Sequence, residues 1–182
     1  MAPLGNLVTI VVPFYNEEEA VGAFYGALCA VLDGIADKSF EVICVDDGSS
    51  DDTLQKLLAL VDRDARFRVI ELSRNFGKEA AITAGLDAAR GDAVIPLDAD
   101  LQDPPELIPS LIAAWQEGAE MVLARRRVRS TDSFLKRKPP RCSTDCIIVS
   151  RACRSRGRWA TSASWTARSS RRSSSCRSGS AS

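Results

Sequence analysis

The sequence of 182 residues contains no histidine. This absence excludes a histidine general base, a histidine-dependent catalytic triad and histidine metal ligands. No apolar run reaches the length of about 18 residues that a membrane-spanning helix needs, and no secretory signal is recognisable. No Gly-x-Gly-x-x-Gly signature of a dinucleotide-binding dehydrogenase follows the first apolar run.

The charges of the chain are unevenly distributed although the net charge is zero. Residues 1–140 hold 15 basic and 23 acidic side chains, whereas residues 141–182 hold nine arginines and one aspartate. Serine and arginine together make up 22 of those last 42 residues. Because such a composition cannot bury an apolar core, we expect one folded domain over residues 1–138 and a disordered tail over residues 139–182.

Apolar runs and amphipathic segments alternate along the first 125 residues. The apolar runs predict strands over residues 7–13, 40–47, 68–72, 92–98 and 120–125. The amphipathic segments predict helices over residues 18–32, 50–61, 77–90 and 104–116. This alternation predicts an α/β fold with a mostly parallel sheet and helices on both faces. Such sheets bind ligands at the carboxyl ends of their strands.

The fourth apolar run ends in the acidic stretch DADLQD, which contains Asp98, Asp100 and Gln102. On an extended segment, side chains two residues apart point to the same side, so we expect these three to converge. Two carboxylates and an amide oxygen suit Mg²⁺ or Mn²⁺ and leave positions for phosphate oxygens. We interpret Asp98, Asp100 and Gln102 as metal ligands. Asp98 and Asp100 would also be catalytic through that metal. The alternative role for Asp100 is helix capping.

Polar side chains also follow the other predicted strands. Asp46 and Asp47 offer carboxylates to a nucleoside base or ribose, the alternative being turn formation. Tyr15 is suited to stacking and Glu17 to hydrogen bonding with ribose or base. Lys78 lies at a predicted helix start, which favours anions, so it is placed to meet phosphate unless it is a solvated surface lysine.

These segments together are similar to a known family. In chain order they are VVPFYNEEEAV, VDDGSSDDT, SRNFGKEAAITAGLDAARGDAVIPLDADLQDPPELIP and MVLARR. They resemble the family 2 glycosyltransferases, especially dolichyl-phosphate mannose synthases and bacterial polyprenyl-phosphate glycosyltransferases. The resemblance extends over about residues 5–138.

The resemblance implies a GT-A fold and a metal-dependent, inverting transfer of a sugar from a nucleotide-diphosphate sugar to a polyprenyl phosphate. It implies nucleotide contacts from Pro13, Tyr15, Glu17 and Asp47 and a contact between Arg125 and the donor phosphates. Intact members are membrane-bound, with the reaction on the cytoplasmic side. A specific nucleic-acid partner is not expected.

The resemblance ends after Lys138, and we interpret the tail as an out-of-frame reading of a GC-rich gene. Codons for PPRCSTDCIIVSR can be chosen so that a shifted frame encodes AEVFYRLHNRIS. Codons for GRWATSASWTARSS can likewise give TLGDFRLMDRQVV, which resembles the family's acceptor-side segment. On this hypothesis the acceptor side is incomplete and later membrane segments are missing, so transfer by this chain needs a direct test.

Two other functions are compatible with the sequence. One is a non-catalytic remnant that binds a nucleotide. The other is a nucleotidyltransferase on a similar fold, although such an enzyme is expected to carry a glycine-rich, basic loop where this chain has PFYNEEE. Read literally, the basic tail would bind RNA or a membrane surface by charge.

Resequencing the gene across codons 130–182 tests the frameshift hypothesis. We expect a one-base difference that restores the acceptor-side strings and an open frame with apolar spans behind them. If resequencing confirms the written frame, either the frameshift lies in the gene itself or the out-of-frame interpretation of the tail is wrong.

Overall fold

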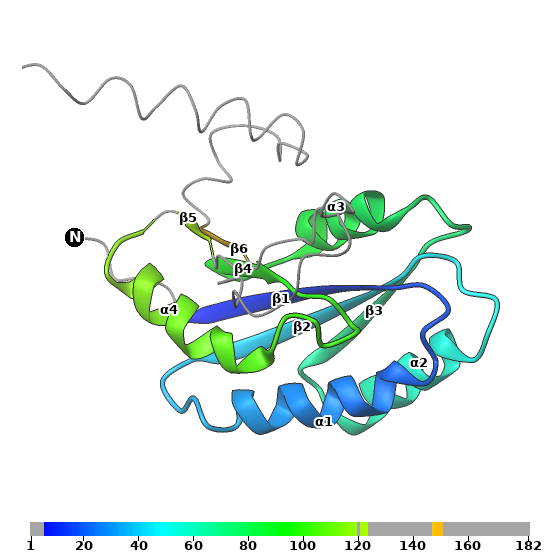
Figure 1. Ribbon diagram of the computed structural model, residues 1–182, viewed down its shortest axis with the longest axis horizontal. Coiled ribbons are helices and arrows are strands. Elements are labelled where there is room, and N and C mark those ends of the chain that lie inside the picture. The colour runs from blue at the N-terminus through cyan, green and yellow to red at the C-terminus, as the bar shows by residue number, and fades with distance from the viewer. Residues whose placement is uncertain (1–5, 120, 124–146, 151–182) are drawn as a thin grey trace, which may run out of the picture.

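A computed structural model of the chain describes residues 6–119, 121–123 and 147–150 (Figure 1). The strands are β1 (Leu7–Phe14), β2 (Ser39–Asp46), β3 (Phe67–Glu71), β4 (Ala93–Pro96), β5 (Met121–Leu123) and β6 (Ile147–Ser150). The helices are α1 (Ala20–Leu32), α2 (Thr53–Arg63), α3 (Lys78–Ala88) and α4 (Ile108–Gln116), the last preceded by the 3₁₀ turn η1 (Pro105–Leu107). Within these ranges, no helix has both the length and the apolar character to cross a membrane.

The strands form one sheet in the order β3-β2-β1-β4-β6-β5. The first four strands of the chain pair in parallel, and β6 runs antiparallel to both β4 and β5. The chain therefore moves outward from β1 to β3 and then returns to the other side of β1 with β4. A reversal of this kind opens a crevice at the carboxyl ends of the central strands.

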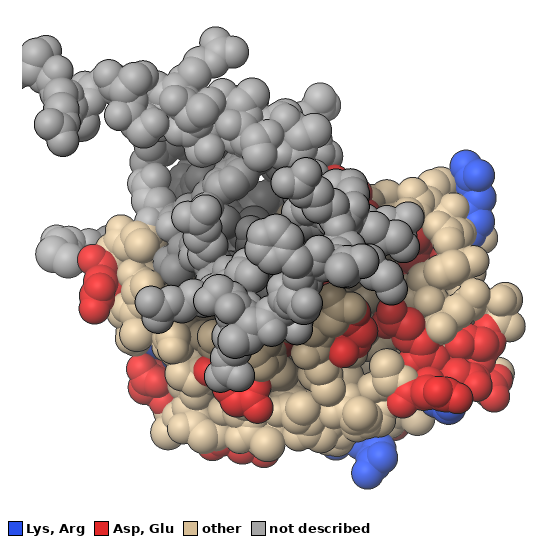
Figure 2. Space-filling view, viewed as in Figure 1, with Lys and Arg blue, Asp and Glu red and all other residues tan. Residues whose placement is uncertain are grey.

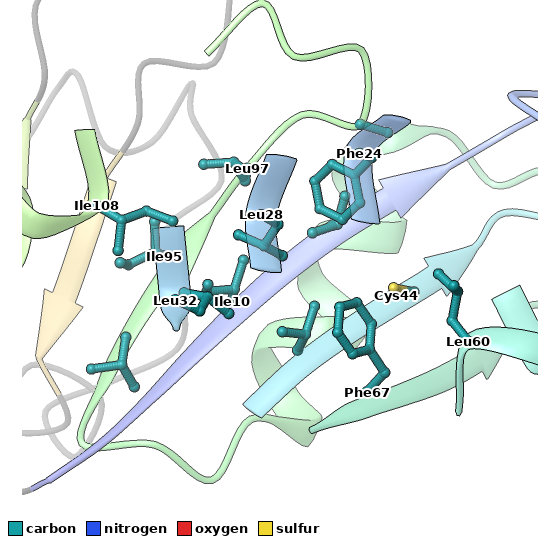
Figure 3. Packing of buried hydrophobic residues seen from close by; sticks show 14 of the residues in the cluster. Ile10, Phe24, Leu28, Leu32, Cys44, Leu60, Phe67, Ile95, Leu97 and Ile108 are labelled. Atoms are coloured by element: carbon teal, nitrogen blue, oxygen red, sulfur yellow. The ribbon is translucent and has the colours of Figure 1, made fainter. Parts of the chain in front are cut away.

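Each face of the sheet has its own apolar core, as predicted. One face packs against α1, α2 and α4, with Ile10, Phe24 and Leu28 among its fully buried side chains (Figure 3). The opposite face packs against α3, where Val11 and Ala81 are completely buried. Helices on both faces explain why β1 and β2 are apolar at nearly every position rather than at alternate ones.

All five predicted strands are present, with ends that differ by a few residues from those predicted. The fourth predicted helix begins differently. Pro104 has an extended ψ of 129°, because the ring of Pro105 disfavours a helical conformation in the residue before it. The chain then forms the turn η1 and becomes α-helical only at Ile108.

The strand β6 was not predicted, and it corrects the expectation that residues 139–182 lack secondary structure throughout. Its backbone pairs with β4 at Val149 and Ser150 and with β5 at Ile147–Val149. Two isoleucines and a valine favour strand formation, and β4 would otherwise present unpaired backbone groups on this side. The other residues of the predicted tail lie outside the described residues.

The packing of α3 on the sheet depends on Gly85. A methyl group there would meet Val11 Cγ1 and lie 3.1 Å from Val45 Cγ2. We expect Gly85→Ala to lower the free energy of unfolding by about 1–3 kcal/mol, because the added carbon overpacks the interface. Gly22→Ala on α1, where nothing lies within 4 Å, is the matched control and should raise it by about 0.5–1 kcal/mol. Urea unfolding followed by circular dichroism measures the free energy of unfolding of both variants. Equal changes in Gly85→Ala and Gly22→Ala would contradict this packing.

Candidate active site

An open cleft of about 190 Å³ lies at the carboxyl ends of the central strands. Its walls come from the ends of β1, β2 and β4 and from the loop before α3. The lining residues are Pro13, Phe14, Tyr15, Glu17, Asp47, Asn75, Gly77, Lys78, Asp98, Ala99 and Asp100. The fold thus brings together seven of the predicted site residues, which are Pro13, Tyr15, Glu17, Asp47, Lys78, Asp98 and Asp100.

The cleft opens where the pairing of β1 with β4 stops. The two strands stay in register up to Val11 and Pro96, and the last backbone bond runs from the Leu97 N–H to the Val11 carbonyl at 2.9 Å. The next bond in this register would need an N–H at position 13, where proline has none. Pro13 therefore ends the ladder, and beyond it the two strand ends are free to separate.

Lys78 and Asp98 form an ion pair across the cleft. The Lys78 Nζ lies 2.7 Å from Oδ1 and 2.8 Å from Oδ2 of Asp98. Lys78 is the first residue of α3, and Asp98 follows β4. The carboxylate is mostly buried, with 14% of its side chain exposed, whereas the lysine side chain is about half exposed. The ammonium group can therefore reach a ligand in the cleft without a change in the position of its helix.

The charge of the cleft is strongly negative. Among its described lining residues, Lys78 is the one cation beside the carboxylates of Glu17, Asp47, Asp98 and Asp100. In Figure 2, acidic side chains gather on the right-hand side of the view, where the carboxyl ends of β1 and β2 lie in Figure 1. Like charges at this density destabilise the folded state unless a cation joins them.

Glu17 carries the clearest sign of this repulsion. Its Oε2 is buried and has no hydrogen-bond partner. Burial raises the pKa of Glu17, repulsion by Asp100 and Asp98 raises it further, and only Lys78 opposes the change appreciably. An orphaned carboxylate oxygen beside two further carboxylates is an arrangement that an added cation would stabilise.

The donor set fits a divalent cation such as Mg²⁺ or Mn²⁺. Asp98 and Asp100 supply two carboxylates, which is the protein contribution that such an ion commonly uses alongside phosphate and water oxygens. Within the described ranges, no three histidine, cysteine or acidic side chains are grouped closely enough to hold a metal alone. The fit is therefore to a cation that shares its coordination with a bound ligand.

The predicted extended backbone from Asp98 through Gln102 is wrong. Leu101 has a φ of 57°, so the chain turns there, and the Gln102 N–H donates to Asp100 Oδ1 at 2.9 Å. Alternation does not continue through such a turn. Gln102 is described by the structure but does not line the cleft, so its role as a metal ligand stays a prediction.

The turn that carries Glu17 is fixed by the start of α2. Asn16 has a φ of 51°, a conformation that asparagine tolerates better than most residues. Its N–H donates to Ser49 Oγ at 3.0 Å, and its Oδ1 accepts from the Ser50 N–H at 2.8 Å. The Glu17 N–H donates to Thr53 Oγ1 at 2.9 Å. These bonds hold the ends of β1 and β2 together.

Asp46 and Asp47 are both buried but contact different groups. Asp46 Oδ2 accepts from the Ser49 N–H at 3.1 Å, its Oδ1 has no hydrogen-bond partner, and the residue does not line the cleft. Asp47 does line the cleft, and its two oxygens accept from the N–H groups of Phe76 and Gly77, each at 2.8 Å. Nucleotide binding by either residue stays a prediction, as does the role of Arg125, which lies outside the described residues.

Asn75 and Gly77 line the cleft, although the sequence analysis did not select them. Gly77 has a φ of 96° and directly precedes α3. Its N–H also donates to Asn75 Oδ1 at 2.9 Å. Asparagine and glycine between a strand and a helix are turn-forming residues, and that signal would have identified them.

We expect Glu17→Gln to raise the free energy of unfolding at pH 7. The pKa of Glu17 is raised above its ordinary value of 4.5, so the wild-type carboxyl loses stabilisation as pH rises through the folded-state pKa, whereas glutamine does not. The difference in the free energy of unfolding between the two proteins should vanish at pH values below the ordinary pKa, where the carboxyl is protonated in both the folded and the unfolded state. Urea unfolding at pH 4 and pH 7 measures this difference, with Glu71→Gln at the exposed end of β3 as control. A less stable Glu17→Gln protein at pH 7 would contradict the assignment.

Comparison with known proteins identifies the family of this chain. The model of the family "Glycosyl transferase family 2" matches residues 9–174. The bactoprenol glucosyl transferase of Shigella phage SfV is 50% identical over 131 residues, which cover 72% of this chain and 42% of that protein. The undecaprenyl-phosphate 4-deoxy-4-formamido-L-arabinose transferase of Aeromonas hydrophila is 41% identical over 132 residues, covering 72% and 40%. The chain thus spans about two fifths of the length of these curated relatives.

A solved structure supports the predicted fold. Glucosyl-3-phosphoglycerate synthase from Mycobacterium tuberculosis, in complex with Mn²⁺, uridine diphosphate and glucosyl-3-phosphoglycerate, has a TM-score of 0.54 at 27% identity. The similarity covers 68% of this chain and 45% of that protein. The sheet order, the helices on both faces and these matches confirm the GT-A fold. The family match extends over most of the sequence, and the chain belongs to glycosyl transferase family 2.

Proposed function

We propose that this chain binds a nucleotide-diphosphate sugar with a divalent cation and belongs to an enzyme that transfers the sugar to a polyprenyl phosphate. The observation that carries the proposal is the cleft itself. Lys78, Asp98 and Asp100 meet at the carboxyl ends of parallel strands, with an excess of negative charge that a cation would neutralise. The names of two relatives, a bactoprenol glucosyl transferase and an undecaprenyl-phosphate sugar transferase, support the acceptor class.

The donor would occupy the cleft in a defined orientation. Asp98 and Asp100 would hold Mg²⁺ or Mn²⁺, which when bound neutralises the diphosphate as it leaves the sugar. Lys78 offers an ammonium group to the diphosphate, and the N-terminus of α3 beside it favours an anion. Tyr15 is 45% exposed at the edge of the cleft, where its ring can stack on the base. Glu17 would accept hydrogen bonds from the ribose or base.

The acceptor makes modest demands on this site. A lipid phosphate is already anionic at neutral pH, so its oxygen can attack the sugar carbon without removal of a proton. The new bond forms as the bond to the diphosphate breaks, and one such displacement inverts the configuration of the sugar. Orientation and charge neutralisation would then supply much of the rate. A lipid acceptor would place the reaction of the intact enzyme at a membrane, and we propose the cytoplasmic side for it.

A second candidate is nucleotide binding without turnover. The observation that favours it is the short coverage of the relatives, of which this chain spans about two fifths. The residues that we propose bind the donor lie among the described residues, whereas both relatives extend well beyond the part that this chain matches. Binding and transfer must therefore be measured separately.

Calorimetric titration of uridine and guanosine diphosphates, each with and without Mn²⁺, tests donor binding. We expect binding only with the metal and a loss of about tenfold or more in affinity in Asp98→Asn and Asp100→Asn, because each variant removes a coordinating charge. Asp62→Asn on the exposed face of α2 removes the same charge elsewhere and should bind normally. Metal-independent binding, or normal binding by both cleft variants, would contradict the proposal. Transfer from a labelled nucleotide sugar to undecaprenyl phosphate then separates the two candidates.

A further inference from the structure

We infer that Asp47 is a positioning residue that builds the donor cleft by holding the loop of residues 73–77, which we call the cleft loop, and through it Lys78. The inference rests on the proposed function, because it states how the donor site is assembled. It differs from the sequence-based prediction that Asp47 itself contacts the nucleoside.

The hydrogen bonds of Asp47 carry the inference. The residue is 2% exposed, and its Oδ1 and Oδ2 accept from Phe76 N–H and Gly77 N–H, each at 2.8 Å. Both are charge-assisted bonds with short distances. Its own N–H donates to the Phe14 carbonyl at 2.8 Å. One buried residue therefore joins the end of β1, the end of β2 and the cleft loop.

The packing of Gly48 shows independently that the cleft loop lies against the end of β2. Gly48 has a φ of 67°, and a methyl group there would lie 2.6 Å from Arg74 Cα and 2.7 Å from the backbone nitrogen of Asn75. The two backbones are therefore in direct contact beside Asp47. No residue larger than glycine fits this approach.

The consequence of this arrangement falls on Lys78. Gly77 is the N-cap of α3, so fixing its N–H fixes where the helix starts and where the Lys78 side chain begins. Lys78 then reaches Asp98 at 2.7 Å from the opposite side of the cleft. The Asp47 carboxylate also lies at the positive end of α3, which stabilises its charge in this position. Asp47 thus sets the distance between the cationic wall and the acidic wall of the site.

Hydrogen exchange of the full chain tests the holding role without any ligand. In Asp47→Asn one acceptor oxygen becomes an amide donor, so we expect the N–H groups of Phe76 and Gly77 to exchange about tenfold or more faster. Exchange within β2 and in the control Asp62→Asn should match the wild type. Unchanged exchange at Phe76 and Gly77 in a folded Asp47→Asn protein would overturn the inference.

Binding of inorganic pyrophosphate with Mn²⁺ separates positioning from direct contact. If Asp47 acts through the cleft loop and Lys78, Asp47→Asn lowers the affinity for pyrophosphate, uridine diphosphate and guanosine diphosphate by the same factor. In a Lys78→Met background, Asp47→Asn should then cause little further loss of affinity. Weaker binding of the nucleotides with unchanged binding of pyrophosphate would show that Asp47 contacts the nucleoside, and it would overturn the inference.

A wild-type measurement covers the case in which Asp47→Asn does not fold. The Phe76 and Gly77 amides should exchange slowly in the free protein and at least as slowly with uridine diphosphate and Mn²⁺. Faster exchange on binding would mean that Asp47 releases the loop to take the ligand, which overturns the inference. Failure of the wild type to bind any of the probes would refute the proposed function, while exchange in the free protein still decides the role of Asp47.

Discussion

The ion pair between Lys78 and Asp98 is the interaction on which the organisation of the cleft depends. It joins the first turn of α3, which covers one face of the sheet, to the end of β4. The strand order makes this contact possible, because β4 returns beside β1 after the chain has passed through β2, β3 and α3. The missing N–H of Pro13 ends the ladder between β1 and β4 and leaves the space in which the pair lies.

The same pair leaves the cleft electrostatically incomplete. One ammonium group faces several carboxylates, Glu17 keeps a buried oxygen without a partner, and its pKa is raised. A protein selected only for stability would not maintain such repulsion, since folded domains are stable by only about 5–15 kcal/mol. Binding sites commonly sacrifice stability in this way for a ligand that restores the balance. Here that ligand would be a divalent cation together with a diphosphate.

The sequence was sufficient for the α/β class, both helical layers and most of the cleft, because apolar strands end in polar residues that a parallel sheet must bring to one edge. It was insufficient where local geometry departs from regular alternation. The positive φ of Leu101 turns the chain, so Gln102 does not follow Asp98 and Asp100 along one side of an extended segment. The turn η1, which includes the second of two prolines, moves the start of α4 towards the C-terminus. The contacts of Asp47 with the cleft loop, and the pairing of β6, join segments far apart in the chain, so no local pattern could reveal them.

A crystal structure of the chain with Mn²⁺ and uridine diphosphate would test the central claim, that the acidic cleft is completed by a cation and a diphosphate, most directly. Anomalous scattering identifies the metal without ambiguity. The account predicts an anomalous peak beside the Asp98 and Asp100 carboxylates, with the Lys78 ammonium group on the diphosphate. A nucleotide bound elsewhere, or bound in the cleft with no metal and the Lys78–Asp98 pair unchanged, would contradict it.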